Sequence, residues 1–435
     1  MVIVFLLAGL AALAALVGLH WYVWRRLVRD TTAGPGLARR AGTVVFVALP
    51  VMMIAALAAE RGGAPFWLQR TLAWPGFLWL ALFIYLGLAL IAGEAVRPLL
   101  RRFLERRGPD RALVPPLQLR KTESVPAGAP ESPEAAKGAT GTPEGQDTPD
   151  TPGSSPRLLA APSRRLFVSR VVAGSAAAVA AGTVGYGTYG VLRGPRVKRV
   201  TVPLAKLPRG AHGFRIAVVS DIHLGPVLGR GFAQKVVDTI NSTQPDLIAV
   251  VGDLVDGSVK DLGPAAAPLA QLRARHGAFF VTGNHEYFSG AQQWVEEVRR
   301  IGLRPLENAR VELPAFDLAG VNDIAGESEG QGPDFTKALG DRDTSRASVL
   351  LAHQPVQIHD AVEHGVDLQL SGHTHGGQLW PGNFVADLAN PTLAGLERYG
   401  DTQLYVSRGA GAWGPPTRVG APSDITVVEL ASRQA

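Results

Sequence analysis

The chain of 435 residues contains no cysteine. Disulfide bonds and thiolate metal sites are therefore excluded, and cysteine usage says nothing about the redox compartment. Internal repeats are also missing. Apolar residues are in excess instead: hydrophobic types make up 46% of the chain and the mean hydropathy is +0.12, which is high for a water-soluble protein. This length and composition predict two or more units, one of them in a membrane.

Charge is almost absent from three apolar stretches near the N-terminus, residues 2–24, 41–59 and 72–93. Each is long enough to cross a bilayer as a helix. A cleaved signal peptide is the alternative for the first, but a basic segment before it and a small-residue cleavage site are both lacking. Arginines cluster after the first and third stretches, whereas the loop between the second and third holds only Arg61 and Arg70. The positive-inside rule then places the N-terminus outside and the chain inside after the third helix.

Aromatic residues are missing from residues 108–162, which are rich in proline, glycine, serine and threonine. This composition predicts a disordered linker after a membrane region, residues 1–107. Within residues 163–193, Arg164 and Arg165 precede a weakly apolar stretch. The pattern resembles a twin-arginine export signal that stays as an anchor, and an ordinary fourth membrane helix is the alternative. Both interpretations place the rest of the chain outside the cytoplasm.

From about residue 200 the pattern changes to short apolar strands that alternate with amphipathic helical stretches. Such alternation predicts an α/β domain over residues 200–435. Strands are expected at residues 214–220, 247–251, 278–281 and 367–370, among others. The later part is richer in strands, which favours a mixed sheet.

Polar residues that can bind metals follow the C-terminal ends of the predicted strands. Because such ends converge on one crevice in open α/β sheets, we expect these residues to meet in space. Each segment alone is weak evidence, since a lone histidine is more often packed or exposed, but five segments in this order predict a metal centre. A mixed nitrogen and oxygen shell suits Mn, Fe, Zn or Co. The residues are Asp221 and His223, Asp253 and Asp256, Asn284 and His285, His353, and His373 and His375.

The order Asp-x-His, Gly-Asp-x-x-Asp, Gly-Asn-His-Glu, His and Gly-His-x-His resembles the motif series of the calcineurin-like metallophosphoesterase superfamily, over roughly residues 200–430. The resemblance implies a two-sheet α/β/β/α sandwich, here preceded by an all-α transmembrane region, and two divalent metal ions. By the same resemblance, one ion is held by Asp221, His223, Asp253 and His375, and the other by Asp253, Asn284, His353 and His373, with Asp253 bridging.

The resemblance also implies that His285 is the catalytic acid and that Asp256 orients its neighbours. Glu286 either orients His285 or is a solvated acidic residue. A narrower resemblance, carried by residues 372–378, 405–409 and 414–418, is to a membrane-anchored bacterial branch with a twin-arginine-type leader, which includes phosphodiesterases of the cell envelope. Arg408 and Arg418 are candidates for holding a non-reacting phosphate, Arg418 being the better one because its loop is rigid. A structural salt bridge is the alternative for both.

These features together predict a dinuclear-metal-dependent phosphoester hydrolase on the outer face of the cytoplasmic membrane. A phosphodiester is favoured over a monoester, and the substrate can be lipid-linked or part of the cell envelope. No nucleic acid is expected as a partner, because the arginines behind the net charge of +6 lie largely at the membrane flanks. The alternatives are a catalytically inactive scaffold, which would usually lack a ligand, and a nuclease of the same superfamily.

Overall fold

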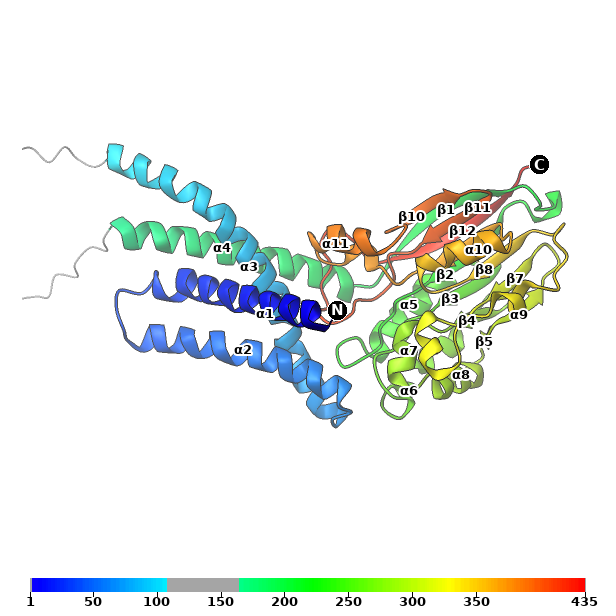
Figure 1. Ribbon diagram of the computed structural model, residues 1–435, viewed down its shortest axis with the longest axis horizontal. Coiled ribbons are helices and arrows are strands. Elements are labelled where there is room, and N and C mark those ends of the chain that lie inside the picture. Colours follow the sequence, from blue (N-terminus) through cyan, green and yellow to red (C-terminus); the bar gives the residue numbers. More distant parts are fainter. Residues whose placement is uncertain (1, 108–163, 435) are drawn as a thin grey trace, which may run out of the picture.

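The structure is a computed structural model that describes residues 2–107 and 164–434. The predicted linker, residues 108–162, lies outside the described residues. Four long helices form one end of the molecule, and an α/β domain forms the other (Figure 1). The helices are α1 (Val2–Trp24), α2 (Leu37–Arg61), α3 (Phe66–Arg107) and α4 (Arg164–Leu192).

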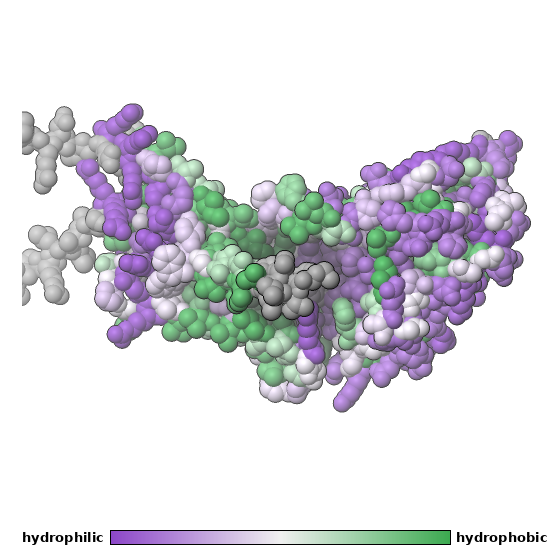
Figure 2. All heavy atoms as spheres, viewed as in Figure 1, coloured by the Kyte–Doolittle hydropathy of each residue, from purple (hydrophilic) through white to green (hydrophobic). Residues whose placement is uncertain are grey.

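Among the described residues, α2, α3 and α4 are long and apolar enough to cross a membrane. Side chains from all four helices share one apolar cluster, which includes Val23, Phe46, Phe83 and Ala180. The outer surfaces of α1 and α2 are also apolar where no other helix covers them. Together with the shared cluster, these surfaces support an association of the helices with a membrane. Figure 2 shows the result as an apolar surface between a hydrophilic end and the hydrophilic α/β domain.

Basic residues gather at the hydrophilic end of the helices, away from the α/β domain. The connection between α1 and α2, the end of α3 and the start of α4 all lie there (Figure 1). Arg26 Nε lies 2.9 Å from Glu94 Oε1 of α3, and Arg170 Nε of α4 donates to the carbonyl oxygen of Thr31 at 3.0 Å. The segments that carry the predicted inside arginines are thus held together at one end.

Two six-stranded mixed sheets build the α/β domain. The first has the order β1-β12-β2-β3-β4-β5, in which only the β12–β2 pair is antiparallel. The second has the order β10-β11-β9-β8-β7-β6, with antiparallel pairs at its two edges. The strands are β1 (Arg196–Leu204), β2 (Phe214–Val219), β3 (Leu247–Val251), β4 (Ala278–Val281), β5 (Arg304–Pro305), β6 (Ala309–Glu312), β7 (Asp317–Gly320), β8 (Ser348–Leu351), β9 (Leu368–Ser371), β10 (Gly395–Tyr399), β11 (Thr402–Val406) and β12 (Asp424–Ser432).

Three apolar layers show how the sheets pack. One cluster, with Val218, Leu351 and Tyr405, lies between the two sheets. A second covers the first sheet with α5 (Arg230–Ser242), α6 (Val259–Ala266) and α8 (Ala291–Arg300), and a third covers the second sheet with α9 (Phe335–Leu339) and α10 (Ile358–Glu363). The predicted α/β/β/α sandwich behind a helical region is therefore confirmed.

The predicted start of the domain, residue 200, is too late because it cuts into β1. This strand runs parallel to β12, with Arg196 opposite Asp424, so the first and last strands of the domain pair with each other. The error has a physical reason. β1 reads Arg-Val-Lys-Arg-Val, and the basic residues look like the flank of a membrane helix, whereas the pairing that makes it a strand is with a segment more than 200 residues away.

The helices pack directly against the α/β domain. Tyr85 Oη of α3 donates to the carbonyl oxygen of Trp380 at 2.9 Å. Val227 of the domain packs against the cluster of Ala56, Ala73 and Phe77 from α2 and α3. The connection of α4 to β1 is thus one of several contacts between the two parts.

Candidate metal centre

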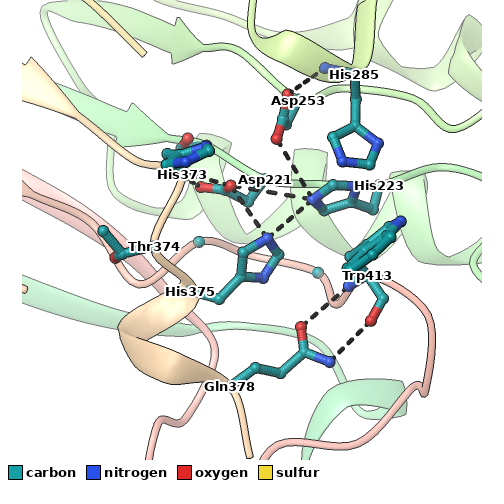
Figure 3. Close-up of polar contacts among 12 residues, drawn as sticks. Asp221, His223, Asp253, His285, His373, Thr374, His375, Gln378 and Trp413 are labelled. Atoms are coloured by element: carbon teal, nitrogen blue, oxygen red, sulfur yellow. Dashed lines mark hydrogen bonds and ion pairs between the residues drawn. The ribbon is translucent and has the colours of Figure 1, made fainter. Parts of the chain in front are cut away.

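All of the predicted metal-binding residues meet at one edge of the two sheets. Asp221 and His223 follow β2, Asp253 and Asp256 follow β3, and Asn284 begins α7 (Asn284–Ser289) after β4. These strands are parallel neighbours in the first sheet. The second sheet contributes His353 after β8 and His373 and His375 after β9, which are also parallel neighbours. Figure 3 shows side chains from both sheets turned toward one space.

The backbone is strained at the candidate ligands. Asp221, His223, Asp253, His373 and His375 all have positive φ, between 49° and 71°. This left-handed conformation is unfavourable for any residue with a Cβ, by roughly 1–2 kcal/mol. The unfavourable backbone conformation at these five positions indicates that the turns hold the candidate ligands in fixed orientations.

Three groups of donor atoms lie close enough together to hold a metal ion, and two of them fall within the predicted ligand sets. In the first, His375 Nε2 lies 3.0 Å from His223 Nε2 and 3.3 Å from Asp221 Oδ1. In the second, Asp253 Oδ2 lies 3.1 Å from His353 Nε2, and His373 completes the group. The same Asp253 Oδ2 is 3.8 Å from His223 Nε2, so this carboxylate lies between the groups.

The donor set fits metal binding. His353 Nδ1 pairs with the carbonyl oxygen of Val251 at 2.8 Å, so the buried Nε2, which lies 3.1 Å from Asp253 Oδ2, is the nitrogen that can bind an ion. The 3.0 Å between His223 Nε2 and His375 Nε2 is about the separation of two nitrogen ligands on one ion with bonds of about 2.1 Å. Asn284 Oδ1 lies 2.9 Å from His373 Nδ1, beside the second group.

The electrostatics of the site also favour cations. Burial raises the pKa of Asp221, and the nearby charge of Asp253 adds to this. Burial disfavours charge on His353, but Asp253 and Asp221 outweigh it and raise the pKa of His353 well above its usual value. Burial and the charge of His223 hold the pKa of His375 well below its usual value. An uncharged imidazole beside buried carboxylates is a ready ligand for a divalent ion.

Asp256 connects a candidate ligand with the predicted catalytic acid. Its Oδ1 accepts from His223 Nδ1 at 2.8 Å and from His285 Nδ1 at 2.7 Å. Burial disfavours the imidazolium of His285, but the hydrogen bond to Asp256 and its charge raise the pKa of His285 to about 9. Asp256 thus contacts the imidazoles of a candidate ligand and of the predicted catalytic acid at the same time.

Neither prediction for Glu286 holds. The side chain is fully buried, so it is not a solvated residue. Its carboxylate accepts from the amides of Asp253 at 3.0 Å, Leu254 at 2.8 Å and Gly283 at 2.6 Å, and no contact with the imidazole of His285 is present among the described residues. Glu286 therefore fixes the loop that carries Asp253.

The prediction that Arg418 holds a phosphate is wrong. Arg418 is buried and lies outside the pocket lining. Its guanidinium donates to the carbonyl oxygens of Gly411 at 2.6 Å and His375 at 3.0 Å, and Nη2 lies 3.2 Å from His375 Nδ1. The N–H groups of this guanidinium are directed to partners within the protein and not to the pocket. Arg418 therefore positions His375. Arg408 makes a long ion pair with Asp424, at 4.0 Å, which agrees with the structural alternative.

Two residues that sequence reasoning missed shape the rim of the site. Gln378 exchanges hydrogen bonds with the backbone of Trp413, at 2.9 and 3.1 Å (Figure 3). The Trp413 ring lies 5.6 Å from the ring of His285, and Phe288 lies 5.6 Å away as well. Gln378 was visible only as the end of the Gly-His-Thr-His-Gly-Gly-Gln motif, and nothing local marked Trp413.

A pocket of about 620 Å³ opens over the donor atoms. Its walls include Phe288 and Trp413 from the α/β domain. Glu60 and Arg61, at the end of α2, also line the pocket, and this part of its wall was not predicted. The other lining residues are Asp253, Asp256, Gly257, Asn284, His285, Ser289, His373 and His375.

We expect Gly187→Ala in α4 to destabilise the protein by about 1–3 kcal/mol. A Cβ at Gly187 would lie 2.7 Å from the carbonyl oxygen of Arg418, which is backbone and cannot move without shifting the loop. Gly190→Ala is the matched control, because a Cβ there meets nothing within 4 Å. Thermal unfolding of both variants in detergent checks this. Equal melting temperatures would show that α4 does not bear on the loop.

Comparison with known proteins assigns the α/β domain to a family. The calcineurin-like phosphoesterase family model matches residues 214–377. A metallophosphoesterase of Aquifex aeolicus is 37% identical over 240 residues, which cover 54% of this chain and 91% of that protein. The chain therefore belongs to the calcineurin-like phosphoesterase family. The family and the clustered donors fit a dinuclear divalent metal site.

A second relative also has a membrane part by its name. The zebrafish "transmembrane protein with metallophosphoesterase domain" is 39% identical over 259 residues, which cover 56% of this chain and 59% of that protein. The match thus spans less than two thirds of that relative. Among solved structures, a dimetal phosphatase from zebrafish is 13% identical with a TM-score of 0.35, over 51% of this chain and 93% of that one.

Proposed function

We propose that this protein is a dinuclear-metal-dependent phosphodiesterase that acts at the outer face of the cytoplasmic membrane. One observation carries the proposal: Asp253 Oδ2 lies within 4 Å of histidines from two separate donor groups, His353 at 3.1 Å and His223 at 3.8 Å. A buried carboxylate between two sets of imidazoles suits a pair of divalent ions and not a single one. An inactive scaffold would be expected to lack a ligand, and the described residues include the full predicted set.

The proposed ligands follow the two donor groups. Asp253 is shared between them, and Asn284 joins the second group through its side-chain oxygen. Mn, Fe, Zn and Co all accept such a mixture of imidazole nitrogen and carboxylate or amide oxygen. The first ion would be held by Asp221, His223, Asp253 and His375, and the second by Asp253, Asn284, His353 and His373.

Two divalent ions at these residues supply charge neutralisation for the phosphoryl group and a water molecule of lowered pKa. His285 is the proposed proton donor. Its Nδ1–H is held by Asp256, which leaves Nε2 for the leaving oxygen of the substrate. The raised pKa of His285, about 9, keeps the imidazolium populated near neutral pH.

The proposed orientation rests on the distribution of arginines. In the positive-inside arrangement, the hydrophilic end of the helices with its basic residues faces the cytoplasm. The α/β domain, from Arg196 onward, lies at the opposite end (Figure 1). We further propose that α1 to α3, within residues 1–107, and α4, within residues 163–193, cross the membrane, that residues 108–162 link them, and that the twin-arginine-type segment at the start of α4 stays as an anchor.

The test uses the full-length protein in detergent, loaded with Mn²⁺. We expect hydrolysis of bis(p-nitrophenyl) phosphate at a higher kcat/KM than p-nitrophenyl phosphate, and loss of both activities after chelation. Metal content is measured on the same sample. Absence of hydrolysis at full metal occupancy, with Mn²⁺ and with the other candidate metals, would contradict the proposed function.

A further inference from the structure

The pocket over the candidate metal centre is completed by the end of helix α2. Glu60 and Arg61 end α2 and line the same pocket as His285 and His373. Phe66, at the start of α3, packs against the apolar core of the α/β domain, so the hairpin between α2 and α3 is seated on that domain. We call residues 60–66 the hairpin wall. It places two charged side chains next to the candidate metal ligands.

The position of Arg61 along α2 indicates the depth of the pocket relative to a membrane that α2 crosses. Arg39 lies near the start of α2, among the basic residues proposed to face the cytoplasm. At a rise of about 1.5 Å per residue, the helix advances about 33 Å from Arg39 to Arg61. The hydrocarbon core of a bilayer is about 30 Å thick. When Arg39 lies at one interface, Arg61 and the pocket beside it lie at the headgroup level of the other.

Exposed apolar side chains mark the same level. Trp67, in the first turn of α3, is 68% exposed, as is typical of an aromatic residue at a membrane interface. Helix α11 (Gly382–Ala389) packs beside the metal-binding turn and has no buried residue, and its Phe384 and Leu388 are 62% and 89% exposed. The pocket residue Phe288 is 75% exposed. Such a surface suits contact with lipid better than with water.

The charges of the hairpin wall are available to a ligand. Neither Glu60 nor Arg61 has an ion pair or a side-chain hydrogen bond to any described residue. A guanidinium beside a phosphoester site binds phosphate oxygens with charge-assisted hydrogen bonds. The neighbouring carboxylate disfavours a second negative charge, which suits the single charge of a phosphodiester.

We propose that the hairpin wall is part of the substrate site, that Arg61 binds the anionic headgroup of a membrane lipid, and that the substrate is a lipid phosphodiester presented at the membrane surface. This inference rests on the proposed function and deepens it. The lipid stays in the bilayer, and its phosphate reaches the metal-binding residues between Arg61 and the rim formed by Phe288 and Trp413.

The experiment uses the full-length protein with Mn²⁺, in mixed micelles that contain phosphatidylglycerol or phosphatidylethanolamine, and bis(p-nitrophenyl) phosphate as the soluble diester. For the lipid, Arg61→Ala is expected to raise KM about tenfold while kcat changes little, because a binding contact made equally in ground and transition states is lost. Arg61→Lys keeps the charge and should raise KM less. Arg70→Ala removes an exposed arginine of α3 that lies outside the pocket lining, and should keep the wild-type KM.

The outcomes separate the inference from the proposed function. A raised KM in Arg61→Ala, partial recovery in Arg61→Lys and unchanged metal content support the role of Arg61. A wild-type KM for the lipid in Arg61→Ala overturns that role. Hydrolysis of the soluble diester with no hydrolysis of either lipid overturns the lipid substrate and leaves the phosphodiesterase standing. Failure on every diester at full metal occupancy overturns the proposed function, and the inference with it.

Discussion

Asp253→Asn is expected to lower the metal content from two ions to fewer than one per chain and to reduce kcat/KM for a phosphodiester by at least about 10³-fold. The carboxylate oxygen Oδ2 lies within 4 Å of ring nitrogens from both donor groups, 3.1 Å from His353 Nε2 and 3.8 Å from His223 Nε2. An amide of the same shape removes the charge that offsets two cations. Metal quantification by mass spectrometry, together with hydrolysis rates, measures both effects.

Asp317→Asn is the matched control for this substitution. Asp317 is also a buried aspartate, but it pairs with Arg310 at 3.1 Å and Arg346 at 2.9 Å, away from the metal centre. Its loss should lower the melting temperature, because the two arginines lose the buried carboxylate that they share, and it should leave the metal content unchanged. Full metal occupancy in Asp253→Asn would show that the carboxylate does not bridge two ions.

His285→Ala is expected to reduce kcat by about 10²–10⁴-fold while metal content stays at the wild-type value. The loss should depend on the leaving group. An alkoxide needs a proton as it departs, whereas p-nitrophenolate is stable without one. We therefore expect a larger loss with an alkyl phosphodiester than with bis(p-nitrophenyl) phosphate, measured as the ratio of kcat values for wild type and variant.

His359→Ala controls for the loss of a histidine as such, because His359 is an exposed residue of α10 outside the pocket lining. It should behave as wild type on both substrates. An equal loss in His285→Ala on the alkyl and the nitrophenyl diester would argue against proton donation. His285 would then act by binding charge in the transition state.

The candidate ligands could be found from sequence because the information is local. Each lies in a turn directly after a short apolar strand, such as Asp253 after β3 or His373 after β9. Parallel strands bring such turns together without further information. The chemical type of each residue then restricts what the shared space can bind.

Features that depend on packing between distant parts of the chain could not be predicted from the sequence. Arg418 is a residue type that often binds phosphate. Its guanidinium donates to carbonyl oxygens instead, because its loop folds against His375. Arg61 was notable only as a rare arginine between two apolar stretches. Its place in the pocket depends on how the helices sit on the α/β domain. β1 was missed for the same reason, since its partner is the last strand of the chain.

The metal content of the full-length protein tests the central claim most directly. The protein is purified in detergent, equilibrated with Mn²⁺, separated from free metal and analysed by mass spectrometry. The shared position of Asp253 between two donor groups predicts two ions per chain. One ion per chain, or none, in a sample that is folded by its thermal unfolding transition would contradict the dinuclear site.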